Sequence, residues 1–366
     1  MGSTVEARNG RGGPLDAMRF IAAAFIVVYH YATDAPVPLG ELSPVFQSGW
    51  LATDFFLMLS GYVLARAYGE RVASGLMSTP QFVGKRVLKL WPAHAVMLVV
   101  LAVMVAAARL SGASAGHSAS YDWQWFPAHL LWLQAWGLGA PPGWNMPTWS
   151  LSALVVCYAL FPVLWRRLAA ASRLTAMTVG LLVLFSAAAL AAAAHLRLAD
   201  LPLQIGVLRA VPLFLFGAAI ARLGPVVEAF ASSAQRAWLG AAVLAAAGAS
   251  FIEPSVGALI LIGAGIAVIG SIAPKRPWVW AEKAAAVSFP LFITHFVSGE
   301  VYFRIVRAVG PRLPGWTAWP LWAGGFVFAL VCALAFVRFV DRPLQAMLGK
   351  LLDRRRQRTL RPAHAA

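Results

Sequence analysis

Charged residues are scarce in this chain, and acidic residues are the scarcest of them. Of the 366 residues, 12% are charged and 60% are hydrophobic, and only 14 are Asp or Glu. The mean hydropathy is +0.72. Soluble domains carry about 25% charged residues. The composition therefore excludes an ordinary soluble domain and indicates an all-α polytopic membrane protein.

Cysteines, internal repeats and long polar stretches are also missing or few. The two cysteines, Cys157 and Cys332, lie in apolar segments, so neither a disulfide framework nor a metal site is predicted. The chain shows no internal repeat, which argues against a transporter built by duplication. The first apolar run is too long for a cleavable signal peptide, and no small-residue cleavage site follows it.

Ten apolar segments are predicted to span a membrane. They lie at about 14–34, 47–68, 92–110, 148–166, 174–195, 208–223, 236–251, 255–273, 284–304 and 316–338. A further apolar piece, 126–138, is too short to span and is predicted to be re-entrant or interfacial.

The distribution of positive charge predicts the orientation. With the N-terminus in the cytoplasm, all but six of the 30 Lys and Arg residues lie on or near the inner side. The six that face outward are Arg109, Arg197, Arg209, Arg304, Arg307 and Arg312. Segment 111–148 contains no Lys or Arg, which places it outside. Both termini are therefore predicted to be cytoplasmic.

Three parts of the chain follow from this reading. They are a cytoplasmic N-terminal segment at 1–13, a membrane domain at 14–343 and a basic cytoplasmic tail at 344–366. The net charge of +16 would suit a nucleic-acid partner, but its distribution indicates topology instead, with some attraction to anionic lipids. No nucleic-acid partner is predicted.

The first predicted span carries two ionisable residues on one face. Arg19 and His30 are eleven residues apart, which returns an α-helix to within roughly 20° of one direction, about 16 Å further along the axis. Ionisable groups inside a membrane helix are costly and usually face a cavity or a partner. Arg19 could instead reach the headgroups and His30 could bond to a neighbouring helix. Two such residues on one stripe favour a functional site.

A basic amphipathic segment follows the second span. Lys85, Arg86 and Lys89 lie within 82–92, whose apolar residues form a lipid-facing side. The pattern predicts an interfacial helix that ends at Pro92, where the third span begins. Such a helix either anchors to lipid headgroups or holds a phosphate-bearing ligand, because clustered Arg and Lys suit phosphates. The segment itself is compatible with both roles.

Further polar residues lie inside predicted spans. Asp54 lies at a depth similar to that of His30, where a carboxylate would stabilise the protonated imidazole. Ser60, Trp149, Ser150 and His295 are candidates for an acceptor site or a cavity wall. Their structural alternatives are close helix packing at Ser60, interfacial anchoring at Trp149 and an interhelical hydrogen bond at His295.

Seven motifs follow one another between residues 15 and 343. They are Arg19 with ten residues before His30, Asp54-Phe-Phe with Ser60-Gly61, Lys85-Arg86-x-x-Lys89-Leu-x-Pro92, Trp149-Ser-Leu-Ser152, Pro212-Leu-Phe-Leu-Phe-Gly217, Ser288-Phe-Pro-Leu-Phe-Ile-Thr-His295 and Asp341-Arg342-Pro343. Together and in this order they resemble the acyltransferase-3 family of integral membrane O-acyltransferases.

The resemblance implies an activity and roles for the candidate residues. It implies transfer of an acyl group, usually acetyl, from cytoplasmic acyl-CoA to a hydroxyl of a surface carbohydrate or related acceptor. His30 resembles the essential histidine, with Asp54 beside it. Arg19, Lys85, Arg86 and Lys89 resemble the acyl-donor contacts. It further implies a bacterial-type inner membrane protein that uses acyl-CoA as co-substrate and holds no permanent cofactor.

His30 can act in two ways in such a reaction. A histidine with a pKa near 7 can remove the proton from an attacking hydroxyl at neutral pH. A covalent acyl-histidine is the alternative.

One position departs from the family pattern. After Trp149-Ser-Leu the family pattern usually continues with two residues and then a glutamate, and here the position of that glutamate is Leu154. The chain is then a catalytically impaired member, or Asp54 supplies the carboxylate. Leu154→Glu is accordingly expected to raise activity. A milder departure is His94, where the family commonly has an aromatic residue.

The main rival function is transport. Buried Arg, Asp and His residues equally mark the pathways of carriers. A carrier or flippase for a sugar or lipid-linked substrate is therefore the alternative to the acyltransferase, and a structural or sensor membrane protein is a third.

Overall fold

The computed structural model describes residues 13–112, 121–230, 232–249, 255–272, 274, 276–310 and 313–360. These residues form helices and no strand, which confirms the all-α class. The predicted N-terminal segment at 1–13 lies outside the described residues except for Gly13, and so does the end of the tail at 361–366.

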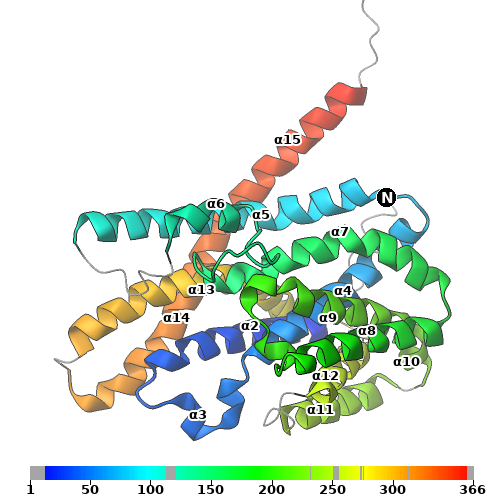
Figure 1. Cartoon of the computed structure of the whole chain (residues 1–366), viewed down its shortest axis with the longest axis horizontal. Coiled ribbons are helices and arrows are strands. Elements are labelled where there is room, and N and C mark those ends of the chain that lie inside the picture. Colours follow the sequence, from blue (N-terminus) through cyan, green and yellow to red (C-terminus); the bar gives the residue numbers. More distant parts are fainter. Residues whose placement is uncertain are drawn as a thin grey trace, which may run out of the picture.

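Helices occur at all ten positions that were predicted to span the membrane (Figure 1). They are α2 (Pro14–Tyr31), α4 (Trp50–Ala73), α5 (Thr79–Leu110), α7 (Trp149–Ala170), α8 (Arg173–Ala193), α9 (Val207–Ile220), α11 (Ser233–Ala249), α12 (Val256–Gly270), α13 (Val279–Val309) and α14 (Ala318–Phe336). Within the described residues, seven helical segments are long and apolar enough to cross a bilayer, and they are built on α2, α5, α7, α8, α9, α13 and α14. Helices α11 and α12 contain 17 and 15 residues and fall short in length. The chain is thus a multi-pass membrane protein with seven clear candidate spans.

Helices α4 and α9 are in backbone contact at the centre of the bundle. A Cβ atom on Gly61 would lie 2.0 Å from the carbonyl oxygen of Phe214, and one on Gly217 would lie 1.9 Å from that of Met58. Small residues allow such close approach in membrane bundles, where dispersion contacts replace the hydrophobic driving force. The close-packing role considered for the Ser60-Gly61 pair therefore holds for Gly61.

Helix α5 corrects one prediction. The basic segment and the third span form one continuous helix of 32 residues, with Pro92 inside it. The helix begins with a capping box, in which the Ser78 side chain accepts from Gln81 N and the Gln81 side chain accepts from Ser78 N. Pro92 removes one backbone hydrogen bond but is buried among neighbouring helices. Membrane helices tolerate proline because neighbours support the backbone, so the helix continues through this position.

The short apolar piece at 126–138 also differs from the prediction of a single re-entrant or interfacial helix. Only Phe126–Leu130 is helical (α6), and an irregular loop follows. The Ser152 hydroxyl accepts from Ala135 N at 3.2 Å and donates to the carbonyl oxygen of Trp132 at 2.6 Å. This buried hydroxyl on α7 satisfies the backbone groups that the irregular loop leaves unpaired.

The C-terminal boundary at 343 falls inside a continuous helical rod. A π-helical turn, Val337–Asp341, joins α14 to α15 (Arg342–Leu360), which extends away from the bundle (Figure 1). The Gln345 side chain donates to the carbonyl oxygen of Lys89 at 3.0 Å and so ties the start of α15 to α5. The predicted basic tail therefore begins as an ordered helix.

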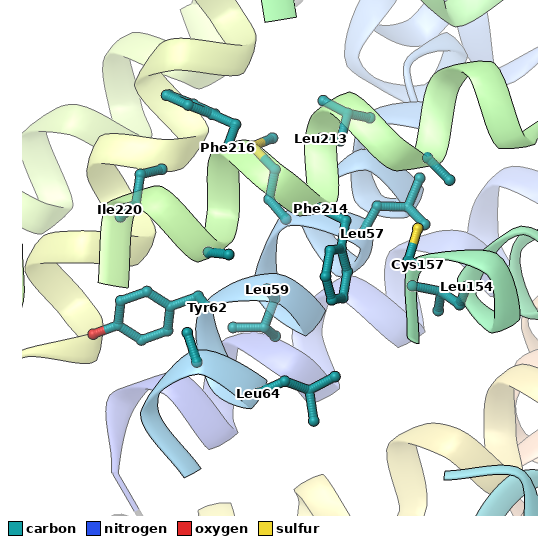
Figure 2. Close-up of a cluster of buried hydrophobic side chains, with 14 of the residues drawn as sticks. Leu57, Leu59, Tyr62, Leu64, Leu154, Cys157, Leu213, Phe214, Phe216 and Ile220 are labelled. Carbon is teal, nitrogen blue, oxygen red and sulfur yellow. The ribbon is translucent and has the colours of Figure 1, made fainter. Parts of the chain in front are cut away.

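The largest hydrophobic cluster joins α4, α7 and α9. Figure 2 shows Phe214 of α9 between Leu59 of α4 on one side and Leu57 of α4 with Leu154 and Cys157 of α7 on the other. This cluster holds α4 and α7 in fixed positions, and both helices contribute walls to the site described next.

Candidate functional site

Five helices enclose a cavity of about 270 Å³. Its walls come from α2, α4, α5, α7 and α13, which are distant in sequence. The charged residues that line it are Arg19, Arg86 and Lys89, and the residues with hydroxyl groups are Thr53, Ser60, Ser150, Tyr158 and Ser288. The other described lining residues are apolar, and none of them is acidic. The cavity therefore combines apolar walls with three positively charged side chains and no acidic one among its described lining residues.

The guanidinium groups of the cavity keep unused donors. Arg86 donates to the Tyr68 hydroxyl, and its guanidinium lies 4.5 Å from the centre of that ring. Arg19 lies 3.6 Å from the carboxylate of Asp16. The Nε atoms of both arginines are buried and find no acceptor among the described residues. Buried cationic donors that line a cavity favour an anionic ligand, because each unmade charged hydrogen bond is costly.

Lys85 lies apart from the other three predicted donor contacts. Arg19, Arg86 and Lys89 line the cavity, whereas Lys85 is exposed and is not among the lining residues. Lys85 and Lys89 are four residues apart on α5, but the cavity meets the face that Arg86, Lys89 and Leu90 share. The structure therefore places three of the four residues together.

His30 continues the stripe of α2 beyond the cavity. Arg19 and Ile26 line the cavity, and His30 lies one helical turn after Ile26 on the same face. The His30 ring centre is 5.3 Å from that of Tyr29 and 5.2 Å from that of His295. The helix spacing inferred from the sequence thus holds, and the ionisable neighbour of His30 is another histidine.

His295 is held inside α13. It is fully buried, and its Nδ1 lies 2.7 Å from the carbonyl oxygen of Phe292 and 3.2 Å from that of Leu291. A hydrogen bond within its own helix replaces the interhelical bond considered from the sequence. His295 is not among the residues that line the cavity, and its ring faces His30 instead.

Asp54 pairs with Arg209 and not with His30. The Asp54 carboxylate accepts from Arg209 Nε at 2.7 Å, and the two residues are 2% and 3% exposed. Arg209 also donates to the carbonyl oxygens of Trp50 and Ala199. No hydrogen bond or ion pair joins Asp54 to His30 in the described part of the chain. A buried carboxylate needs a cation, and Arg209 supplies it in full.

Arg209, one of the six charges predicted for the outer side, is not exposed. Its guanidinium is buried between helices and lies 5.5 Å from the centre of the Trp149 ring and 5.8 Å from that of Trp50. Trp149 is itself buried and stacks on this cation instead of anchoring at the interface. An Arg and an Asp in apolar segments must find partners, and that rule was the available signal for this pair.

The remaining candidates lie in the cavity wall. Ser60 donates to the carbonyl oxygen of Phe56 at 2.8 Å, and Ser150 donates to that of Pro147 at 3.2 Å. Both hydroxyls keep acceptor capacity toward the cavity that they line. Leu154 lines the cavity and also packs in the α4–α7–α9 cluster (Figure 2). A carboxylate at position 154 would therefore share the cavity with Arg19.

Tyr158 was missed from the sequence. It lines the cavity on the stripe of Ser150 and Leu154, because residues at i, i+4 and i+8 lie on one helical face. Its hydroxyl makes no hydrogen bond within the described residues. The helical spacing from Ser150 could have identified it.

The fold defines a polytopic membrane protein with a cavity inside the bundle that Arg19, Arg86 and Lys89 line, and the comparisons name its family. A family model described as an acyltransferase domain matches residues 14–338. The chain belongs to this acyltransferase-3 family.

Two relatives are similar over parts of the chain. One is the acyltransferase MdmB of Streptomyces mycarofaciens, which is 31% identical over 164 residues, 42% of this chain and 39% of the relative. The other is protein 2 in the picA locus of Rhizobium radiobacter, which is 38% identical over 88 residues, 24% of this chain and 42% of the relative. The matches thus span less than half the length of either relative. No solved structure matches the chain.

Proposed function

We propose that this protein is a membrane-bound O-acyltransferase. It moves an acyl group, in the first place acetyl, from cytoplasmic acyl-CoA to a hydroxyl of a surface carbohydrate or related acceptor. The observation that carries the proposal is the cavity that Arg19, Arg86 and Lys89 line, with no acidic residue among its described lining residues, at the start of the helix stripe that leads to His30. The ten-span arrangement, both cytoplasmic termini and an inner-membrane location belong to the same proposal.

The donor suits the shape and charge of the cavity. An acyl-CoA has a polyanionic nucleotide and a long thin arm that ends in the thioester. Arg86 and Lys89 of α5 hold the phosphates, and Arg19 faces the same space from α2. The apolar walls between Ile26 and Phe292 accommodate the arm and exclude water from it. The thioester then reaches toward His30.

His30 supplies the proton transfers. Its imidazole removes the proton of the acceptor hydroxyl while the hydroxyl oxygen bonds to the thioester carbon. The carbon–sulfur bond then breaks, and the imidazolium returns the proton to the leaving thiolate. The products are the O-acyl ester and free CoA, and His30 regains its neutral form. Acyl-CoA is a co-substrate in this scheme and no permanent cofactor is required.

The decisive experiment is transfer of radiolabelled acetyl from acetyl-CoA by membranes that contain the protein. His30→Ala is expected to lower the rate about 10²–10⁴-fold at equal amounts of folded protein, because the hydroxyl loses its base. Ile21→Ala, on the exposed side of the same helix, is the matched control and should retain the parent rate. A His30→Ala variant as active as its parent would overturn the proposal.

The same assay distinguishes an acyltransferase from the alternative function, a carrier or flippase. A carrier or flippase would leave acetyl-CoA intact, so membranes with the parent protein would release no free CoA thiol above the background of empty membranes. Release of CoA that depends on His30 supports the acyltransferase.

A further inference from the structure

The two histidines at the end of the α2 stripe differ in how their rings are held. His295 is fully buried, and its Nδ1 lies within hydrogen-bond distance of two carbonyl oxygens of its own helix. A carbonyl oxygen only accepts, so Nδ1 must carry the hydrogen. In the neutral ring the lone pair is then on Nε2. The helix therefore sets one tautomer for His295.

This Nε2 atom is a buried acceptor that nothing in the described part of the chain satisfies. A buried polar atom without a partner costs free energy, so such an atom in a folded protein calls for an explanation. The polar side chain whose ring contacts His295 from another helix is His30, because Tyr31 turns its hydroxyl to the backbone of α13. The nitrogens of His30 likewise make no hydrogen bond within the described residues.

The separation of the two rings suits a direct interaction. Their centroids are 5.2 Å apart and the ring planes are inclined by 38°. An in-line N–H···N bond of about 2.9 Å places two imidazole centroids roughly 5 Å apart. A rotation of the His30 ring, without movement of either helix, would therefore make the bond. Catalytic hydrogen bonds are often incomplete in a ligand-free site and form when the substrate binds.

The backbones that carry the pair are locked together. The Tyr31 hydroxyl, next to His30, donates to the carbonyl oxygen of His295 at 2.7 Å. The Ser298 hydroxyl donates to the same oxygen at 3.0 Å. A Cβ atom on Gly299 would lie 2.5 Å from the Tyr31 ring, so this glycine is needed for the close approach of α2 and α13. The register between His30 and His295 is therefore set by the contacts that Tyr31, the neighbour of His30, makes with α13.

We infer that His295 is the positioning residue of His30. Its Nε2 accepts the N–H of His30, which turns the other nitrogen of His30, with its lone pair, toward the acceptor hydroxyl. When His30 takes the proton of the hydroxyl, the same Nε2 remains the acceptor for the imidazolium N–H and stabilises it. A neutral histidine thus takes the role of hydrogen-bond partner of His30 that the sequence predicted for a carboxylate, either Asp54 or a residue at position 154. The inference rests on the proposed role of His30 as general base.

Two substitutions at this position separate positioning from a structural role. The amide of His295→Asn reaches the Nδ1 position and keeps the bond to the helix carbonyls, but it has no atom at Nε2. The longer side chain of His295→Gln brings an amide oxygen close to the Nε2 position and keeps an acceptor there. If the role of His295 is merely structural, the Asn variant should be as active as the Gln variant. If His295 positions His30, the Gln variant should be more active than the Asn variant.

The test measures kcat, the KM for acetyl-CoA and the melting temperature of the parent, both variants and the control Thr294→Val. Thr294 is the neighbouring buried residue of α13, and its hydroxyl donates to the carbonyl oxygen of Pro290. We expect His295→Asn to lower kcat about 10–100-fold with an unchanged KM. His295→Gln should recover part of that loss, and Thr294→Val should match the parent. Equal kcat in the Asn variant and the parent, or equal losses in Asn and Gln that follow the melting temperature, would overturn the inference.

Two further measurements keep the result decidable. His30→Ala in the same series must be inactive, and an active His30→Ala variant would reject the proposed function and not only the role of His295. If the Asn variant is not recovered folded, ¹⁵N NMR of the parent in lipid nanodiscs decides. A single neutral tautomer of His30 is expected, and a mixture of both tautomers would overturn the inference.

Discussion

At the scale of single residues, the role of a buried charge in the bundle depends on the residue with which it pairs. Asp54 has the depth expected of a partner for His30, yet it is held by Arg209, whose remaining donors bond to backbone oxygens of Trp50 and Ala199. Three helix-end and loop segments thereby meet at one buried guanidinium. This arrangement indicates that Asp54 stabilises the end of the bundle where α4 and α9 begin.

Removing either Asp54 or Arg209 should therefore lower the stability of the fold, and any loss of transfer activity should follow from the loss of folded protein. Asp54→Asn and Arg209→Met each leave a buried charge unpaired, which typically costs about 3–5 kcal/mol. We expect less folded protein and a lower melting temperature, measured by thermal unfolding and size-exclusion chromatography in detergent. The double variant Asp54→Leu/Arg209→Met should recover much of the loss, because it removes both charges together. An Asp54→Asn protein that melts like its parent but transfers no acyl group would instead make Asp54 catalytic.

At the scale of the element, α5 carries two of the proposed donor contacts, Arg86 and Lys89, on the same helix as the predicted third span. Because α5 does not break at Pro92, Arg86 and Lys89 are held by the buried half of the same helix. An amphipathic helix that merely lay on the surface could rotate about its axis. The continuous α5 presents one face to the cavity and leaves Lys85 outside the lining.

That difference between two faces of α5 gives a matched test. The double variant Arg86→Gln/Lys89→Gln should weaken acetyl-CoA binding to the purified protein and flatten its dependence on salt, because two phosphate contacts are lost. Lys85→Gln removes a positive charge from the exposed face of the same helix and should bind like the parent. If the double variant binds acetyl-CoA at low salt as the parent does, Arg86 and Lys89 do not contact the donor, and their face of α5 anchors to lipid instead.

At the scale of the whole molecule, the positive charges of the expected outer side are largely compensated. Arg197 pairs with Asp200, Arg307 pairs with Asp34, and Arg209 pairs with Asp54. In the exposed pair, the hydrogen bonds from Arg197 lower the pKa of Asp200. Arg109 donates to the carbonyl oxygen of Tyr121. Arg66, which is predicted to lie inside, is likewise paired with Glu228, so the orientation stays a prediction.

Single cysteines in a background without Cys157 and Cys332 test this orientation. Gln124→Cys, in the exposed loop before α6, should react with a membrane-impermeant maleimide on intact cells. Ser74→Cys, in the exposed turn after α4, should react only after the membrane is permeabilised. The reverse pattern would invert the protein in the membrane and with it the sidedness of donor and acceptor.

The sequence by itself determined the local features of this protein. Hydropathy and helix signals located the helices, and the eleven-residue spacing placed Arg19 and His30 on one stripe, because helical periodicity depends on neighbouring residues alone. Seven ordered motifs were enough to identify the family, whereas the clustered Arg86 and Lys89 were compatible with either a lipid anchor or a phosphate-bearing ligand.

Only the tertiary structure decided the partners. Close packing decides which apolar helices become neighbours in a bilayer. Hydropathy does not identify those neighbours, because any apolar helix can face lipid. Asp54 therefore joined Arg209, 155 positions away, and His30 met His295 across the α2–α13 contact. The continuity of α5 through Pro92 likewise depended on neighbouring helices that support the backbone. Helical spacing is a property of one segment, whereas the pairing of buried polar groups is a property of the packed bundle.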